Sequence, residues 1–336
     1  MLSAGSTLSP AQGGDGLLTP LEHRRPPDQT FLTFAEWYLV HSPAEYAAYL
    51  GRGAEPSRFP LFSHIGQFWS SYRAVSREIQ RYPFNGGYHL MVMVIGSRTT
   101  VEYGFKGLYE HTVGRLAEAT RSGAPVPEER FAAAFAQDYV DFIRVEPWYQ
   151  FDFLSRLKRL WSEVPTAGPD LPRRWERRFA LSSELLVKEG YARLIKLGTQ
   201  SLYDAPTPVT AVLLSAEARA DPQHPDYVRL PTPAAVLATV PRYDAFTAYS
   251  LWLAGQGLDF REIAGNRDEV LVSLLVPQGW QAGGEVRSRQ LFAQPVLTRA
   301  GIQRLVLATP ISQLGQLLRQ VVREQGAAAV EHVYDF

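Results

Sequence analysis

Apolar residues recur at intervals of three or four through most of residues 31–203, which is the spacing of an amphipathic helix. Within residues 131–142, for example, three phenylalanines and a tyrosine fall on one helix face. Ser42 is a suitable N-cap, and Pro43 suits the first position of the helix after it. The pattern therefore predicts helices over Phe34–Tyr38, Pro43–Leu50, Phe62–Tyr82, Tyr88–Thr120, Pro127–Val145, Phe153–Trp161 and Trp175–Tyr203.

Beyond residue 208 the pattern changes to short runs rich in β-branched residues, which are typical of strands. The segment Gly265–Asp268 separates two apolar runs and predicts a hairpin loop. We expect strands over Val209–Leu214, Ala235–Val240, Val270–Val276, Leu291–Leu297 and Gln303–Thr309. Together with the preceding helices, these strands give a fold of class α+β.

Residues 233–265 and 303–336 carry the same pattern twice. Val236–Thr239 and Val306–Thr309 both read Val-Leu-Ala-Thr, and each is followed by a proline, an apolar helix-like stretch and a strand-like run. A strand, a helix and a strand form the half-unit of a ferredoxin-like sandwich. We therefore predict a ferredoxin-like domain built from two βαβ units, with both helices on one sheet. The first helix is rich in aromatic residues, so we expect it to face the helical domain.

The end of the second copy resembles a known family. Gly326, followed by Val330–Tyr334, is similar to the corresponding segment of ACT-type ligand-sensing domains. The sequence departs from that family where each helix opens, because the Pro-Gly of the family is replaced by Pro310-Ile311 and Pro241-Arg242. The resemblance implies that residues 209–336 serve self-association, giving a homodimer, or ligand sensing.

Composition divides the chain into domains. Of the 40 Phe, Tyr and Trp residues, 30 lie within residues 31–203, which predicts a thick aromatic core or a large apolar pocket there. Residues 1–30 are rich in Gly, Ser and Pro and are expected to be a disordered leader. Asp204–Pro208 contains two prolines and is predicted to link the helical domain, residues 31–203, to the α+β domain, residues 209–336.

Charge and cysteine content exclude several classes of function. The chain has no Cys, which excludes disulfides, thiolate nucleophiles and iron–sulfur ligation. Its 34 basic and 34 acidic residues balance, so no nucleic-acid partner is expected. No apolar run reaches the length of a transmembrane helix, and no secretory signal is recognisable. We therefore expect a cytoplasmic protein, with peripheral contact to the inner face of a membrane as an alternative address.

Four charged residues form the first candidate site. Arg98, Glu102, Lys106 and Glu110 follow one another at intervals of four inside an otherwise apolar helix. Neighbours at this spacing can pair on the helix surface. The ladder is interpreted either as a solvated helix face or as the lining of a polar channel or anion site.

The second candidate site is a pair of carboxylates, Asp138 and Asp141, with Arg144 on the same helix side. Their spacing in an aromatic-rich helical domain is similar to the metal-diphosphate site of isoprenoid synthases, although the longer motif of those enzymes is absent. The alternative function is therefore a metal-dependent enzyme acting on an apolar or isoprenoid-like substrate. If the protein is such an enzyme, Arg98 or Arg144 would bind an anionic group of the substrate.

The third candidate is an aromatic and basic segment. Trp148, Phe153 and Trp161 are followed by a group of arginines at residues 173–178. Such a segment can lie flat on a membrane, or it can pack its aromatic face on its own domain. Motifs for nucleotide, haem, di-iron and zinc sites are absent or carried by isolated histidines, so no cofactor and no metal site is predicted.

The sequence therefore predicts a non-enzymatic binding or interaction protein. The helical domain would recognise an apolar small molecule, a protein partner or a membrane surface. The α+β domain would serve self-association or sensing. This hypothesis rests on a large aromatic inventory without a recognisable catalytic constellation.

Overall fold

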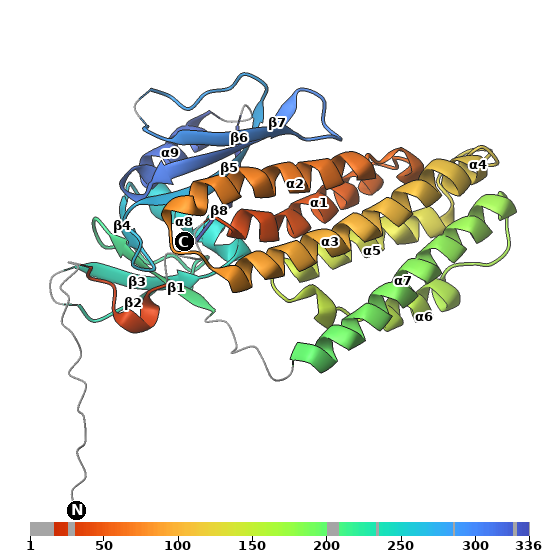
Figure 1. Ribbon diagram of the computed structural model, residues 1–336, viewed down its shortest axis with the longest axis horizontal. Coiled ribbons are helices and arrows are strands. Elements are labelled where there is room, and N and C mark those ends of the chain that lie inside the picture. Colours follow the sequence, from red (N-terminus) through yellow and green to blue (C-terminus); the bar gives the residue numbers. More distant parts are fainter. Residues whose placement is uncertain are drawn as a thin grey trace, which may run out of the picture.

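The computed structural model describes residues 17–25, 31–199, 208–232, 235–284, 286–324 and 328–335. The fold is α+β, because a helical region is followed along the chain by two antiparallel four-stranded sheets. Figure 1 shows the long helices lying roughly parallel, with the strands gathered toward one end of them. The predicted linker, except Pro208, and much of the predicted leader lie outside the described residues.

The helices agree with the apolar periodicity of the sequence. Between them lie the short 3-10 helices η3 (Pro56–Arg58), η4 (Ile79–Arg81) and η6 (Trp148–Gln150). The α-helices are α1 (Thr33–Gly51), α2 (Leu61–Glu78), α3 (Gly86–Tyr109), α4 (Arg115–Glu118), α5 (Pro127–Ile143), α6 (Phe153–Glu163) and α7 (Leu171–Thr199). A π-helical turn, η5 (Glu110–Gly114), joins α3 to α4, so the long helix predicted here contains a π-bulge.

The predicted break at Ser42 is wrong, because α1 runs through Ser42 and Pro43 without interruption. Proline inside a helix removes one backbone hydrogen bond. Tertiary contacts offset this cost. Ser42 is buried, and its hydroxyl lies 3.0 Å from His64 Nδ1 and 2.9 Å from the Tyr103 hydroxyl, on α2 and α3.

Two sheets of identical strand order follow the helices. The first sheet has the order β2-β3-β1-β4, and the second has the order β6-β7-β5-β8. The first contains β1 (Val209–Leu214), β2 (Val228–Arg229), β3 (Val236–Pro241) and β4 (Phe260–Ile263). The second contains β5 (Glu269–Pro277), β6 (Arg289–Pro295), β7 (Ile302–Pro310) and β8 (Ala329–Val333). Each sheet belongs to one unit of the order βββαβ, with α8 (Asp244–Gly255) in the first and α9 (Ile311–Arg323) in the second.

The two copies of the sequence repeat, residues 233–265 and 303–336, contain β3-α8-β4 and β7-α9-β8. In each unit, the strands on either side of the helix pair with one earlier strand between them, β1 or β5, and both pairings are antiparallel. The register shifts at equivalent places, between Leu213 and Leu214 and between Ser273 and Leu274. The expectation of a single sheet is wrong, because each unit builds its own sheet around an inserted strand.

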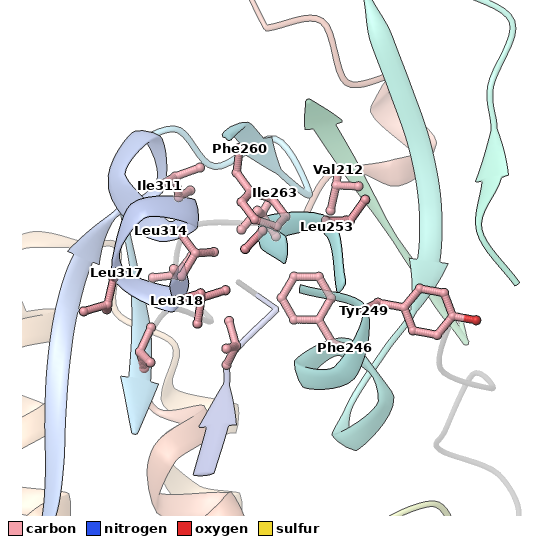
Figure 2. Packing of buried hydrophobic residues seen from close by; sticks show 14 of the residues in the cluster. Val212, Phe246, Tyr249, Leu253, Phe260, Ile263, Ile311, Leu314, Leu317 and Leu318 are labelled. Atoms are coloured by element: carbon pink, nitrogen blue, oxygen red, sulfur yellow. The ribbon is translucent and has the colours of Figure 1, made fainter. Parts of the chain in front are cut away.

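One core joins the two units. Figure 2 shows Phe246 of α8 facing Leu314 and Leu318 of α9, with Phe260 and Ile263 of β4 nearby, whereas the ring of Tyr249 points away from α9. Helix α8 contacts β8 of the second unit, and α9 contacts β4 of the first. Phe246 is therefore used between the two units, and Tyr249 and Trp252 pack on His224 of their own unit. For these three residues the expectation that the aromatic face of α8 meets the helices is wrong.

The helices contact the second sheet instead. Phe34 and Tyr38 of α1 share a buried cluster with Leu271 of β5 and Val306 of β7, and Tyr334 completes this cluster. Residue by residue, β5 alternates between this cluster and the core between the units, because successive side chains of a strand point to opposite faces. Both faces of the second sheet are therefore covered.

Two further segments differ from their predicted roles. Gly265, whose φ is +82°, lies in a turn that links β4 to β5, and these strands belong to different sheets. The segment is therefore a connection between the units and is no hairpin. Within the predicted leader, Thr19 is buried and its hydroxyl donates to Glu262 of β4 at 2.7 Å, so this part of the chain makes specific contacts. Among the residues that the structure describes, no helix has the length and apolar character needed to cross a bilayer.

Candidate functional site

A cavity of about 980 Å³ lies inside the helical region, among α1, α3, α5, α7 and η6. The residues of α3 that line it extend from Gly87 to Lys106, which corresponds to a length of about 28 Å. A space of this volume and length is narrow and elongated. Its walls are mainly apolar and aromatic, and they include Val40, Tyr46, Ile95, Ala132, Phe135, Ala136, Tyr139 and Leu181.

The two ends of the cavity differ in exposure. At one end, the lining residues Leu90, Val94 and Val145 are 65%, 51% and 74% exposed. At the other end the lining residues Leu50 and Leu181 are buried. The cavity is therefore open near the start of α3 and bounded by buried side chains toward the end of that helix.

Five charged side chains of α3 and α7 form a continuous series of ion pairs along the cavity wall. Glu184 lies 2.9 Å from Lys106 Nζ and 2.7 Å from Lys188 Nζ. Glu102 lies 3.2 Å from Lys188 Nζ and 3.2 Å from Arg98 Nη2. The charges thus alternate in the order Lys106, Glu184, Lys188, Glu102, Arg98. We call these five residues the α3–α7 ion-pair chain.

The two lysines and two glutamates of this chain keep their charges at neutral pH. Burial alone would lower the pKa of Lys106 and Lys188, but the neighbouring carboxylates, Glu184 for the first and Glu102 for the second, outweigh it and raise both pKa values. Burial would likewise raise the pKa of Glu102 and Glu184, and the nearby ammonium groups reverse that effect and lower both pKa values. The cavity therefore has a charged stripe along an otherwise apolar wall.

Arg98 is packed against two aromatic rings of the cavity wall. Its guanidinium carbon lies 3.9 Å from the ring centroid of Trp148 and 5.2 Å from that of Tyr191. These two rings stack on each other with an interplanar angle of 11°. Cation–π contacts of this kind orient an arginine side chain. The position of the guanidinium is therefore set by η6 and α7 as well as by its own helix.

The hydroxyl groups of Ser42 and Tyr103 form a second polar region of the cavity wall. Ser42 and Tyr103 line the cavity and contact each other, and Ser42 also contacts His64. Burial, together with the charge of Arg304, lowers the pKa of His64 to about 3, so this imidazole is neutral at neutral pH. Ser42 lies inside α1, where the helix itself uses the backbone amides of the surrounding turns. The hydroxyls of Ser42 and Tyr103 therefore add polar groups to the cavity wall.

Most of the predicted ligand or interface residues line the cavity. These are Arg98, Glu102, Lys106 and Trp148. The fourth member of the ladder, Glu110, instead holds Arg177 through two hydrogen bonds of 2.8 and 3.1 Å, away from the cavity lining. The remaining two candidates also lie apart from the cavity: Phe153 is buried in the core, and Trp161 is half exposed beside Trp175.

The predicted carboxylate pair lies on the surface. Asp138 is 45% exposed and lies 2.7 Å from Arg156, and Asp141 is 57% exposed and lies 3.8 Å from Arg144. Neither aspartate lines the cavity, although Arg144 does. In the described part of the chain, no three His, Asp or Glu side chains converge in an arrangement that could hold a metal ion. The geometry gives the metal-dependent alternative no support, and we do not propose it further.

The predicted basic segment is buried. Arg173, Arg174, Arg177 and Arg178 are all less than 5% exposed, and each pairs with at least one glutamate. These glutamates come from η5, α5, α7 itself and the segment before η3, and they are Glu55, Glu110, Glu128, Glu129 and Glu176. The four arginines are therefore structural, and their guanidinium groups are not exposed to lipid headgroups.

Two site residues were missed by the sequence reasoning, Glu184 and Lys188 of α7. Their spacing of four residues, which places them 2.7 Å apart, was the available signal. Such a pair occurs on many solvated helix faces, so the spacing alone does not indicate a site. The partners on α3 could not be identified from spacing, since Lys106 and Glu184 are separated by 78 positions.

Comparisons with family models, with curated proteins and with solved structures find no match to this chain.

Proposed function

We propose that the helical region is a non-enzymatic binding module for an apolar, elongated small molecule. The observation that carries this proposal is the cavity of about 980 Å³ with its largely apolar wall. Its volume is at the upper end of the usual range for small-molecule sites, which combine apolar walls with a few placed polar groups. The charged stripe and the hydroxyls of Ser42 and Tyr103 supply those polar groups.

Binding of an uncharged fluorescent probe, N-phenyl-naphthylamine, tests this proposal. Ala136→Leu narrows the cavity from α5, and Val40→Trp fills it from α1, since both residues line the cavity. We expect each substitution to weaken probe binding at least about tenfold, because the filled space is no longer available to the ligand.

The matched control is Ala134→Leu, on the same helix as Ala136 but exposed. It should bind the probe as the unmodified protein does, and melting curves should show that all three variants are folded. Equal probe binding by all variants, or no binding by the unmodified protein, would contradict the proposal.

A second candidate function is contact with a membrane surface. Leu90, Val94, Val101, Phe105 and Leu108 are 51–74% exposed and recur along one face of α3. We call these five residues the α3 stripe. Two of them, Leu90 and Val94, also line the cavity. A bilayer that covered the stripe would therefore lie directly at the open end of the cavity, and an apolar ligand could pass between the two without crossing water.

For the strand region, we propose the ferredoxin-like assignment at the level of each unit. The support is the arrangement of β3-α8-β4 and of β7-α9-β8, in each of which one strand, β1 or β5, lies between the two strands that flank the helix. We retain self-association or sensing as the role of this region. The measurement that decides it is the oligomeric state in solution by light scattering, and a monomer at all concentrations would rule out self-association.

A further inference from the structure

The α3–α7 ion-pair chain carries more positive than negative charge. Both of its ends are cations, Lys106 and Arg98, and each of its two carboxylates is shared between two cations. Three positive charges therefore face two negative charges along the cavity wall. Because a charge in a largely apolar space is stabilised chiefly by an opposite charge, the chain lacks one negative group.

The second buried ionic cluster of the helical region shows no such excess. Arg121 joins the four buried arginines of α7, and these five cations pair with five glutamates. The cavity-lining chain therefore differs from a cluster of the same fold that has a purely structural role.

The remaining charged groups of the cavity wall lie toward its open end and have other partners. The Glu36 carboxylate accepts a hydrogen bond of 2.8 Å from the Tyr88 hydroxyl, and Arg144 lies 3.8 Å from Asp141. Glu146 is exposed to solvent. With Asp141 these groups comprise three carboxyl groups and one guanidinium, so the positive excess is local to the ion-pair chain and does not extend over the whole cavity wall. Among the described residues, neither Glu36 nor Glu146 lies within salt-bridge distance of a cation of the chain.

Of the two terminal cations, Arg98 is the better placed for a ligand. Its planar guanidinium offers several N–H donors in a geometry that suits a carboxylate. It is fixed over Trp148 and lies about 12 Å nearer than Lys106 to the open end, measured along α3. Among the described residues, its only carboxylate partner within salt-bridge distance is Glu102.

We propose that the ligand of this cavity is a single-chain amphiphile with one carboxylate, which pairs with Arg98 while the apolar chain extends toward the buried end. This inference rests on the proposed function and adds the chemical class of the ligand. The carboxylate supplies the negative charge that the ion-pair chain lacks. The aliphatic chain lies against the wall formed by Val40, Phe135, Ala136 and Leu181.

Calorimetric titration of the full chain with dodecanoate and with dodecanol tests the inference, because the two probes share a chain and differ in charge. We expect dodecanoate to bind at least about tenfold more tightly. Arg98→Met should abolish this preference and leave dodecanol binding within about twofold. Arg98→Lys, which keeps the charge, should retain part of the preference and guards against a loss caused by misfolding.

Arg144→Met is the matched control, because Arg144 also lines the cavity but has the surface partner Asp141. It should keep the full preference for dodecanoate. Equal affinities for the two probes, a preference that survives Arg98→Met, or one lost in Arg144→Met would each overturn the inference while the proposed function stands. Failure of both probes to bind would overturn the two together.

Discussion

At the scale of single residues, Glu184 makes the two shortest ion pairs of the ion-pair chain, 2.9 Å to Lys106 and 2.7 Å to Lys188. Burial and these two ammonium groups act on it in opposite directions, and the net effect is a pKa well below its ordinary value. Because the pKa of Glu184 is lower in the folded protein than in the unfolded chain, its ionised carboxylate stabilises the fold at neutral pH. This stabilisation is lost as the pH falls from the ordinary pKa of a glutamate toward the lower pKa of the folded protein. Removing the charge leaves Lys106 without its carboxylate partner in the chain and Lys188 with Glu102 alone.

We predict that Glu184→Gln lowers the free energy of unfolding by about 2–3 kcal/mol, less than for a completely buried pair because the side chain is 19% exposed. Glu189→Gln, on the same helix, removes an ion pair with Arg193, which is 63% exposed, and should cost less than about 0.5 kcal/mol. Urea unfolding of the two variants measures the difference. Equal losses would show that the ion-pair chain has no special role in stability.

At the scale of elements, periodicity predicted most helices and strands, and its failures have physical causes. Pro43 interrupts the local pattern, but α1 continues past it. The buried hydrogen bonds of Ser42 to His64 and Tyr103 stabilise the helix at this point. The ladder at Arg98 and Glu102 was found from its spacing. Its surroundings were not predictable, because the partners on α7 and the rings of Trp148 and Tyr191 come from distant parts of the chain.

The α3 stripe is also an element-scale feature, and the apolar pattern predicted its helix without showing that one face stays uncovered. A monomeric protein rarely exposes a continuous row of large apolar side chains without a use for it. The five exposed residues of the stripe lie on the same helix as Arg98 and Lys106, two of the cations that line the cavity. One helix would thus serve both the membrane surface and the ligand.

We predict that the protein sediments with phosphatidylcholine vesicles and that Phe105→Ser reduces the bound fraction at least about threefold, because insertion of a phenyl ring contributes to interfacial binding. Phe84→Ser is the matched control, since Phe84 is 80% exposed but lies outside the stripe and before α3. It should leave vesicle binding unchanged. Absence of the protein from the vesicle pellet would exclude this membrane contact.

At the scale of the whole molecule, the repeated Val-Leu-Ala-Thr segments do occupy equivalent strands, β3 and β7. What the repeat could not reveal is the strand inserted into each unit, because β1 and β5 share no such segment with each other. The second sheet then has two covered faces, one toward the first unit and one toward α1. One face of the second sheet therefore packs against α1 of the helical region, and the cavity lies within that region.

The most direct measurement of the central claim is the affinity of uncharged n-alkanols, from octanol to octadecanol, by displacement of N-phenyl-naphthylamine. An elongated cavity bounded by Leu50 and Leu181 predicts that affinity rises about fourfold with each methylene until the chain fills the space, and then stops rising. An affinity that does not depend on chain length would contradict the account, because it would place the ligand outside the cavity.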